Sequence, residues 1–288
     1  MHLKKAFIIS VSVGFAPGLF ALIEAMKDYG HTEDLHVLLW DDFYNSKYDF
    51  LLDKIENVET PFRIIPVPIK NVREKYMEHE RHRGWECRFL AYPYMFNEID
   101  YDVYCIWAGD LLLLNNIDRY LDIGSMFTIL SYNMSFPKTK SLIEQKVQTA
   151  SPGYNAIVNV PFITSDKELL QQIWNESQDK SNGDMLCIYN AIVATNSFDR
   201  LFLVPRNNWT PNRASREPIK QIGNEYYMFD GSRLNSFHGP LWDGWGFNEK
   251  RFNPDAIKRN AMFREVYLAV AEKYGLKMKG KIAYVSPS

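Results

Sequence analysis

The N-terminal pattern is an uncharged run over residues 6–23 that follows a pair of lysines. Such a run is also typical of a signal peptide or a membrane anchor. Gly14 and Pro17 interrupt it, however, and they divide it into a β-prone segment and a segment with apolar positions at helical spacing. Because Pro17 suits a first helical turn and Gly30 suits a helix end, the pattern favours a strand, a loop and a helix over a signal or anchor.

The rest of the first half alternates between β-prone runs and helical patterns. Buried strands are predicted at residues 35–40, 62–67 and 101–107, and helices at residues 48–55, 72–83 and 88–96. The prolines within 62–67 place that strand near a sheet edge or make it end early. Strands that alternate with helices indicate an α/β fold whose central sheet is mainly parallel and flanked by helices.

The second half is less regular. Strands are predicted at residues 126–132, 156–160 and 201–204, and helices at residues 167–177 and 185–193. Residues 206–253 are rich in Asn, Pro, Gly and Trp and are predicted to be loop-like. A last helix is predicted from an Asn253 cap to a Gly275 stop. With no convincing linker, the chain is predicted to be a single domain, 1–288, with halves at 1–120 and 121–253 and a C-terminal helix and tail at 254–288.

The composition excludes several classes of protein. The 288 residues are 46% hydrophobic with a formal net charge of −2, which rules out a disordered or collagen-like chain. The 33 basic residues are balanced by 35 acidic ones, and this argues against a dedicated DNA-coating protein. Three widely spaced cysteines form no zinc motif, so a reduced, cytoplasmic chain is expected.

Candidate chemistry begins where the strand predicted at 101–107 ends. There Asp110 lies between two β-prone runs, the strand itself and residues 111–117. A carboxylate buried between such runs must be paired, hydrogen-bonded or bound to a metal, because burying it alone is costly. The alternative is a turn aspartate that caps its own backbone. Ligands bind at the carboxyl ends of strands in open parallel sheets, so a ligand-binding carboxylate also fits this position. Both interpretations of Asp110 therefore stay open here.

This segment, from Arg88 through the strand to Asp110, resembles the central segment of the glycogenin-like retaining glycosyltransferases, which have the GT-A fold. On that register Asp110 takes the place of the second aspartate of an Asp-X-Asp motif, the main metal ligand, whereas Ala108 replaces the first. The resemblance implies a divalent ion, Mn²⁺ or Mg²⁺, at Asp110. It also implies donor contacts by Arg88, Trp107, Ala108 and Asp110. The loss of an oxygen ligand at Ala108 weakens the expected metal and ribose contacts.

Three more stretches follow in the family's order. Residues 151–159 are similar to its Asn-Ser-Gly strand motif, residues 182–187 to its Asp-Gln-Asp motif, and residues 236–240 to its His-Phe-X-Gly-Pro motif. The resemblance implies catalytic roles for Asn155 and Asp184, a metal ligand at His238 and a donor contact at Gly239. In strict register Ser236 occupies the position of the family's metal-binding histidine, and His238 lies two positions later.

Each of these residues also has a structural interpretation. Asp184 is placed like an acid in the first turn of a helix, and a lone histidine such as His238 is more often bonded to backbone. Arg88 forms an ion pair with a nearby acid just as readily as it binds phosphate. A metal-free site would rely on cations such as Arg88, Lys250 and Arg251.

Two neighbouring stretches have two interpretations each. The charged stretch 73–88 mixes both signs and is either a solvated helix face or, by the resemblance, a lid near the donor. Residues 40–44, with two acids and three aromatic rings, either border a nucleotide base or simply connect a strand to a helix.

The resemblance thus predicts a glycosyltransferase, hexosyltransferase-like and acting with retention, that moves a sugar from a nucleotide-sugar, with UDP favoured. Aromatic residues crowd the loop-like stretch and suit the faces of a carbohydrate or glycosylated acceptor, with Trp209, Trp242 and Trp245 on the acceptor side. Two rivals remain. One is a catalytically silent nucleotide-sugar or glycan-binding relative, and the other a transferase with a nucleic-acid acceptor. A homodimer is one form that the sequence allows.

Overall fold

The computed structural model describes residues 3–77, 89–109, 111–129, 157–179 and 184–197. It also describes eight shorter stretches towards the C-terminus: residues 202–205, 219–223, 225–228, 231, 233–238, 272–273, 277–279 and 282–284.

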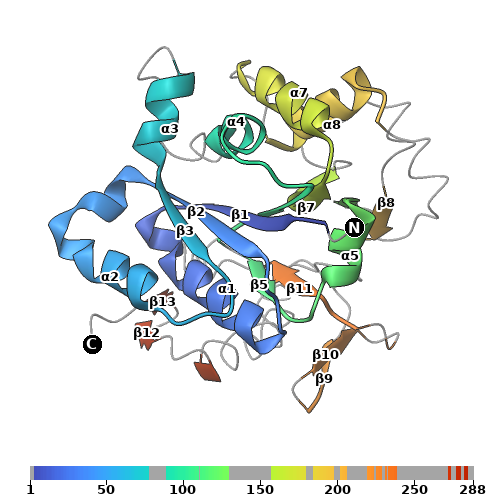
Figure 1. Ribbon diagram of the computed structural model, residues 1–288. Coiled ribbons are helices and arrows are strands. Elements are labelled where there is room, and N and C mark those ends of the chain that lie inside the picture. Colours follow the sequence, from blue (N-terminus) through green and yellow to red (C-terminus); the bar gives the residue numbers. More distant parts are fainter. Residues whose placement is uncertain are drawn as a thin grey trace, which may run out of the picture.

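A central sheet organises the described part of the chain (Figure 1). Its seven strands lie in the order β3-β2-β1-β4-β7-β6-β8. They are β1 (Lys5–Val11), β2 (Asp34–Leu39), β3 (Ile64–Pro68), β4 (Val103–Trp107), β6 (Ser125–Ile129), β7 (Ile157–Thr164) and β8 (Phe202–Pro205). The pairs β3–β2, β2–β1, β1–β4 and β6–β8 are parallel, while β7 is antiparallel to β4 and β6. The predicted α/β class with a mainly parallel sheet is confirmed.

Helices cover both faces of this sheet. In Figure 1 one layer holds α3 (Ile69–Tyr76), α4 (Ala91–Asn97), α7 (Lys167–Ser177) and α8 (Asp184–Ala194), and the other holds α1 (Ala16–Asp28) and α2 (Asp49–Asn57). Each layer encloses its own hydrophobic core against the sheet. The alternation of side chains along a strand explains this division, because Phe7 and Ile9 face the α1 core whereas Ile8 faces the α4 core.

The N-terminal run forms a strand and a helix, as predicted. Pro17 lies in the first turn of α1, where its missing N–H costs no hydrogen bond. Gly30 follows the helix with φ +73°, a left-handed conformation that glycine adopts without strain. In the part of the chain that is described, no helix is both long and apolar enough to cross a membrane.

Prolines mark the irregular places of the sheet. β3 lies at its edge and carries Pro66 and Pro68, which lack the N–H that a further strand would need. Pro161 lies inside β7, although the predicted strand stopped at residue 160. The pairing of β6 with β7 is shifted between Phe127 and Thr128, so that residues 159–161 are passed over in the ladder. A proline is tolerated at such a bulge.

The second half corrects the prediction of a loop over residues 206–253. That stretch contains β9 (Ile219–Ile222), β10 (Glu225–Met228) and β11 (Ser236–His238). The short helix α5 (Asp118–Ile123) and the hairpin β12 (Lys277–Lys279) and β13 (Ile282–Tyr284) were not predicted either. These elements are too short for periodicity to reveal, and β11 pairs with β5 (Leu111–Leu113), far away in the sequence.

Other boundaries moved by a few residues. The predicted helix at 72–83 is α3, which begins at Ile69 and ends at Tyr76, and residues 78–88 lie outside the described part. The predicted helix at 167–177 has the predicted bounds, because the side chain of Asp166 caps its N-terminus by accepting from the Leu169 N–H at 3.0 Å. Most of the helix predicted from Asn253 to Gly275 lies outside the described residues.

Candidate functional site

The candidate site lies where β1 and β4 end. Starting from β1, the chain places β2 and β3 on one side of that strand and β4 on the other. The sheet order therefore reverses between β1 and β4, and a crevice opens at the carboxyl ends of strands at such a point. The loops that border it are residues 12–15 after β1 and residues 108–110 after β4.

The loop after β1 is held by the segment after β2. The Trp40 N–H donates to the Val11 carbonyl at 3.0 Å, which extends the strand pairing beyond its last register pair. The Trp40 indole N–H donates to Ser10 Oγ at 2.8 Å. Two residues further along in each segment, the Val13 N–H donates to the carboxylate of Asp42 at 3.0 Å. The two loops thus form one hydrogen-bonded unit at the end of the sheet.

Two neighbouring acids in the short 3₁₀ helix Asp41–Tyr44 have different environments. Asp41 accepts a hydrogen bond from Arg73 of α3, with 2.7 Å between Oδ2 and Nη1. Partial burial raises the pKa of Asp42, and hydrogen bonds from backbone N–H groups, including that of Val13, oppose this shift. Asp42 is therefore oriented by backbone, while Asp41 is engaged by an arginine.

The end of β4 combines a buried ring with a tight turn. Trp107 is buried, and its ring lies edge-on to Phe7 with 6.0 Å between centroids, so its side chain belongs to the core on the α1 side. Ala108 is partly exposed, and its carbonyl accepts from the Leu111 N–H at 3.1 Å. The turn therefore carries a methyl group at the position that the resemblance assigns to the first aspartate.

Gly109 brings this turn against the loop after β1. A Cβ added to Gly109 would lie 2.6 Å from the Cβ of Phe15, closer than real side chains approach. The two loops are in contact here, and only glycine permits so close an approach.

Replacing Gly109 with alanine is expected to destabilise the protein by about 1–3 kcal/mol, since the Cβ of Phe15 cannot rotate away and the backbone must shift. Urea denaturation measures the change. Gly14→Ala in the opposite loop is the matched control, because the nearest atom to its Cβ would be Ser12 Oγ at 3.8 Å. Equal stability of the two variants would contradict the close approach.

The strand that follows the turn brings a distant segment to the site. β5 pairs antiparallel with β11, and the register places His238 opposite Leu111 and Ser236 opposite Leu113. Opposed residues in such a ladder have Cα atoms about 5 Å apart. The side chains of Asn115 and Asn235, both buried, extend this pairing with a 3.0 Å hydrogen bond. The backbone of His238 thus lies beside the residue that directly follows Asp110.

Most of the other predicted site residues fall outside the described part of the chain. These are Arg88, Asp110, Asn155, Trp209, Gly239, Trp242 and Trp245. Asp184 is the first residue of α8, as its interpretation as a first-turn acid predicts. Tyr226, one of the aromatic residues in the stretch predicted to be loop-like, is buried in β10 and serves packing.

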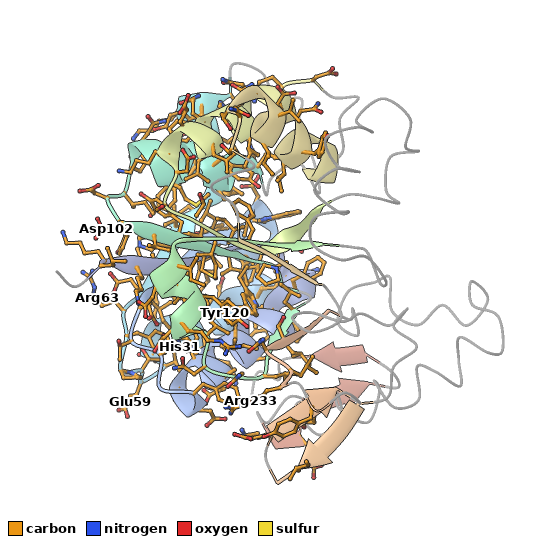
Figure 2. All side chains as sticks on the ribbon, turned by 90° about the vertical axis from the view of Figure 1, so that its right-hand side faces the viewer. His31, Glu59, Arg63, Asp102, Tyr120 and Arg233 are labelled. Atoms are coloured by element: carbon orange, nitrogen blue, oxygen red, sulfur yellow. The ribbon has the colours of Figure 1, made fainter. Side chains whose placement is uncertain are left out.

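A second cluster of polar side chains lies at the opposite ends of the strands and was not predicted. Among the described residues, His31, Glu33 and Asp118 bring three candidate metal-binding atoms within 4.8 Å of one another. His31 Nδ1 lies 2.9 Å from Glu33 Oε2 and 3.2 Å from Asp118 Oδ1. Figure 2 shows His31 near Tyr120 of α5. No sequence motif predicts this cluster, because Asp118 is far from His31 along the chain.

The hydrogen bonds of this cluster favour a structural role. The Ile117 N–H points at His31 Nε2 from 3.4 Å, so that nitrogen accepts and Nδ1 carries the proton. Nδ1–H then donates to Glu33. Burial alone would raise the pKa of Glu33, but its hydrogen bonds, that from His31 foremost, outweigh burial and lower that pKa. A metal at Nδ1 would displace this proton and break the hydrogen bond to Glu33. We therefore infer that the cluster has a structural role and holds α1, β2 and α5 together.

Comparisons with known proteins gave fold neighbours only. No family model matches the chain, and no curated protein sequence matches it. Its structure is similar to that of the galactosyltransferase LgtC in complex with donor and acceptor sugar analogues, with a TM-score of 0.48, 12% identity and coverage of 89% of this chain and 94% of that one.

Two further structures are glycosyltransferases. Mouse xyloside xylosyltransferase 1 gives a TM-score of 0.42 and 9% identity, with 72% of this chain and 87% of that one covered. The bifunctional glycosyltransferase WbbM gives 0.47 and 11%, with 75% of this chain and 41% of that one covered. At these identities the likeness is one of fold, and function has to be argued from the residues of the site.

Proposed function

We propose that the protein is a glycosyltransferase that moves a sugar from a nucleotide-sugar, with UDP as the favoured nucleotide, to a carbohydrate or glycosylated acceptor. The observation that carries this proposal is the pairing of β11 with β5. It sets the backbone of His238 opposite Leu111, and in the sequence Leu111 directly follows Asp110. This pairing supports a site to which a carboxylate and an imidazole from distant segments contribute, near the sheet reversal where ligands bind in open α/β folds.

The residues at this point fit a divalent ion. Asp110 and His238 would hold it, and an oxygen ligand with an imidazole suits Mn²⁺ better than Ca²⁺. Bound there, the ion would neutralise charge on the diphosphate leaving group. Ala108 contributes no ligand, so the protein supplies a smaller donor set than an Asp-X-Asp motif does. Asp184 would accept hydrogen bonds from the hydroxyls of the donor sugar, and Asn155 would have the catalytic role that the resemblance implies.

The silent alternative also has an observation in its favour. Ser236, which stands in strict register for the expected histidine, is completely buried, and Ala108 offers only a methyl group. A protein with these two changes, in which His238 does not bind a metal ion, would bind a nucleotide-sugar without transferring the sugar.

A donor panel separates these functions. The full chain is incubated with UDP-, GDP- and CMP-sugars, with and without Mn²⁺, and donor hydrolysis and nucleotide affinity are measured in parallel. We expect slow hydrolysis of one donor class, and we expect Mn²⁺ to stimulate it. NMR should show that the anomeric configuration of the transferred sugar is retained. Tight nucleotide binding without turnover would support the silent binder. Absence of both would contradict the two functions together.

A further inference from the structure

A nucleotide-sugar site of the kind proposed above needs an acceptor for the hydroxyl groups of the donor's ribose. The resemblance assigns that contact to the first aspartate of the Asp-X-Asp motif, and this chain has Ala108 there. A methyl group accepts no hydrogen bond, and a ribose hydroxyl that is bound without a partner weakens the binding of the nucleotide. The acceptor must therefore come from another segment that borders the same crevice.

Asp42 borders it through direct contacts. It follows β2, the strand beside β1, and its carboxylate accepts from the Val13 N–H at 3.0 Å. Val13 begins the 3₁₀ turn that ends at Phe15, and Phe15 is in close contact with Gly109, the residue after Ala108. The three-residue turn Val13–Phe15 thus lies between Asp42 and the loop after β4, in which Ala108 replaces the family's first aspartate.

The chemistry of Asp42 suits this contact. A carboxylate has about four lone-pair positions, and backbone N–H groups, that of Val13 among them, occupy only part of this capacity. Asp42 is an exposed residue, so other positions face solvent. Partial desolvation, which raises its pKa, also strengthens the hydrogen bonds that the group accepts. The neighbouring Asp41 offers a contrast, because it is bound to Arg73 on α3.

We propose that Asp42 accepts the hydrogen bond of a ribose hydroxyl of the nucleotide-sugar donor and so replaces the aspartate that Ala108 lacks. This inference rests on the proposed function and names one of its recognition residues. It agrees with the general rule that ligands of open α/β sheets bind at the carboxyl ends of the strands, since Asp42 follows the end of β2. Asp42 becomes a residue that distinguishes ribonucleotides from deoxyribonucleotides.

The test compares nucleotides that differ only in one ribose hydroxyl. Isothermal titration calorimetry of the full chain gives the Kd of UDP, 2′-deoxy-UDP and 3′-deoxy-UDP, or of the GDP series if the donor panel selects GDP. We expect the wild type to bind the ribonucleotide about 10–100-fold more tightly than one deoxy analogue, as for a hydrogen bond to a charged group. Asp42→Asn should reduce this ratio to about threefold or less.

The control is Asp41→Asn, which removes the adjacent charge and should keep the full ratio. Asp42→Asn leaves an oxygen for the Val13 N–H and should fold, and Asp42→Ala, checked by circular dichroism, gives an independent second variant. A wild-type ratio that survives in both Asp42 variants overturns the inference while the proposed function stands. If the wild type binds no nucleotide, the proposed function itself fails.

Discussion

Asp110→Asn is expected to lower the rate of sugar transfer about 10²–10³-fold and to abolish its stimulation by Mn²⁺. The amide has nearly the same size as the carboxylate but no charge, so it holds a divalent ion poorly. With Ala108 beside it, the chain has no second carboxylate in this turn to compensate. Initial rates measured across a Mn²⁺ titration, with the donor that the panel selects, give both effects.

The matched control is Asp118→Asn in the cluster with His31. It makes the same chemical change at the other candidate metal site, and we expect it to leave the rate and the Mn²⁺ dependence unchanged. His238→Ala should raise the Mn²⁺ concentration needed for half-maximal rate. Loss of metal dependence in Asp118→Asn, together with its retention in Asp110→Asn, would move the metal to the His31 cluster.

The stability of the protein is expected to fall by about 3 kcal/mol as the pH drops from 7 to 4, through the titration of His36. His36 is 2% exposed on β2. Its Nδ1 lies 2.8 Å from the Tyr94 hydroxyl and its Nε2 3.0 Å from the Tyr101 hydroxyl. Burial lowers the pKa of His36 from 6.5 to about 4, and the charge of Asp34 opposes this only in part.

The sign follows from the proton balance. Between about pH 6.5 and pH 4 the unfolded chain binds a proton at His36 and the folded protein does not, so acid favours unfolding. The stabilisation is complete above pH 6.5 and is lost as the pH falls towards 4. Glu33 acts in a lower window, because its pKa is lowered from 4.5 to about 2 and its contribution is lost only below 4.5.

Urea unfolding at pH 7, 6 and 5 tests this prediction. About 2 kcal/mol of the loss should occur by pH 5 in the wild type. His36→Gln cannot titrate, so its free energy of unfolding should change less over the same interval, whatever its stability at pH 7. Parallel curves for the two proteins would show that His36 is charged in the folded state.

The hydrogen bonds around His36 have a defined direction. The Tyr101 hydroxyl donates to Asp34 at 2.5 Å, and it therefore accepts a hydrogen bond from the Nε2–H of His36.

Local patterns predicted the first half of the fold well. β1, α1, β2 and β4 are long enough, and their apolar periods regular enough, for burial to leave a clear signal in the sequence. Pro17 and Gly30 placed the ends of α1 because each acts through its own backbone conformation. α5, β9, β10 and β11 were missed because elements of three to six residues hold at most two periods of a strand or helix pattern.

For the site, the sequence by itself determined which side chains are available, whereas the tertiary structure decided which of them meet. Asp110, Ala108 and His238 are properties of the sequence, and so is the glycine at 109. That His238 pairs opposite Leu111, that Phe15 closes on Gly109 and that Asp42 reaches Val13 depend on strand order and register. Such contacts join residues tens to more than a hundred positions apart, and only the packing of the sheet brings them together.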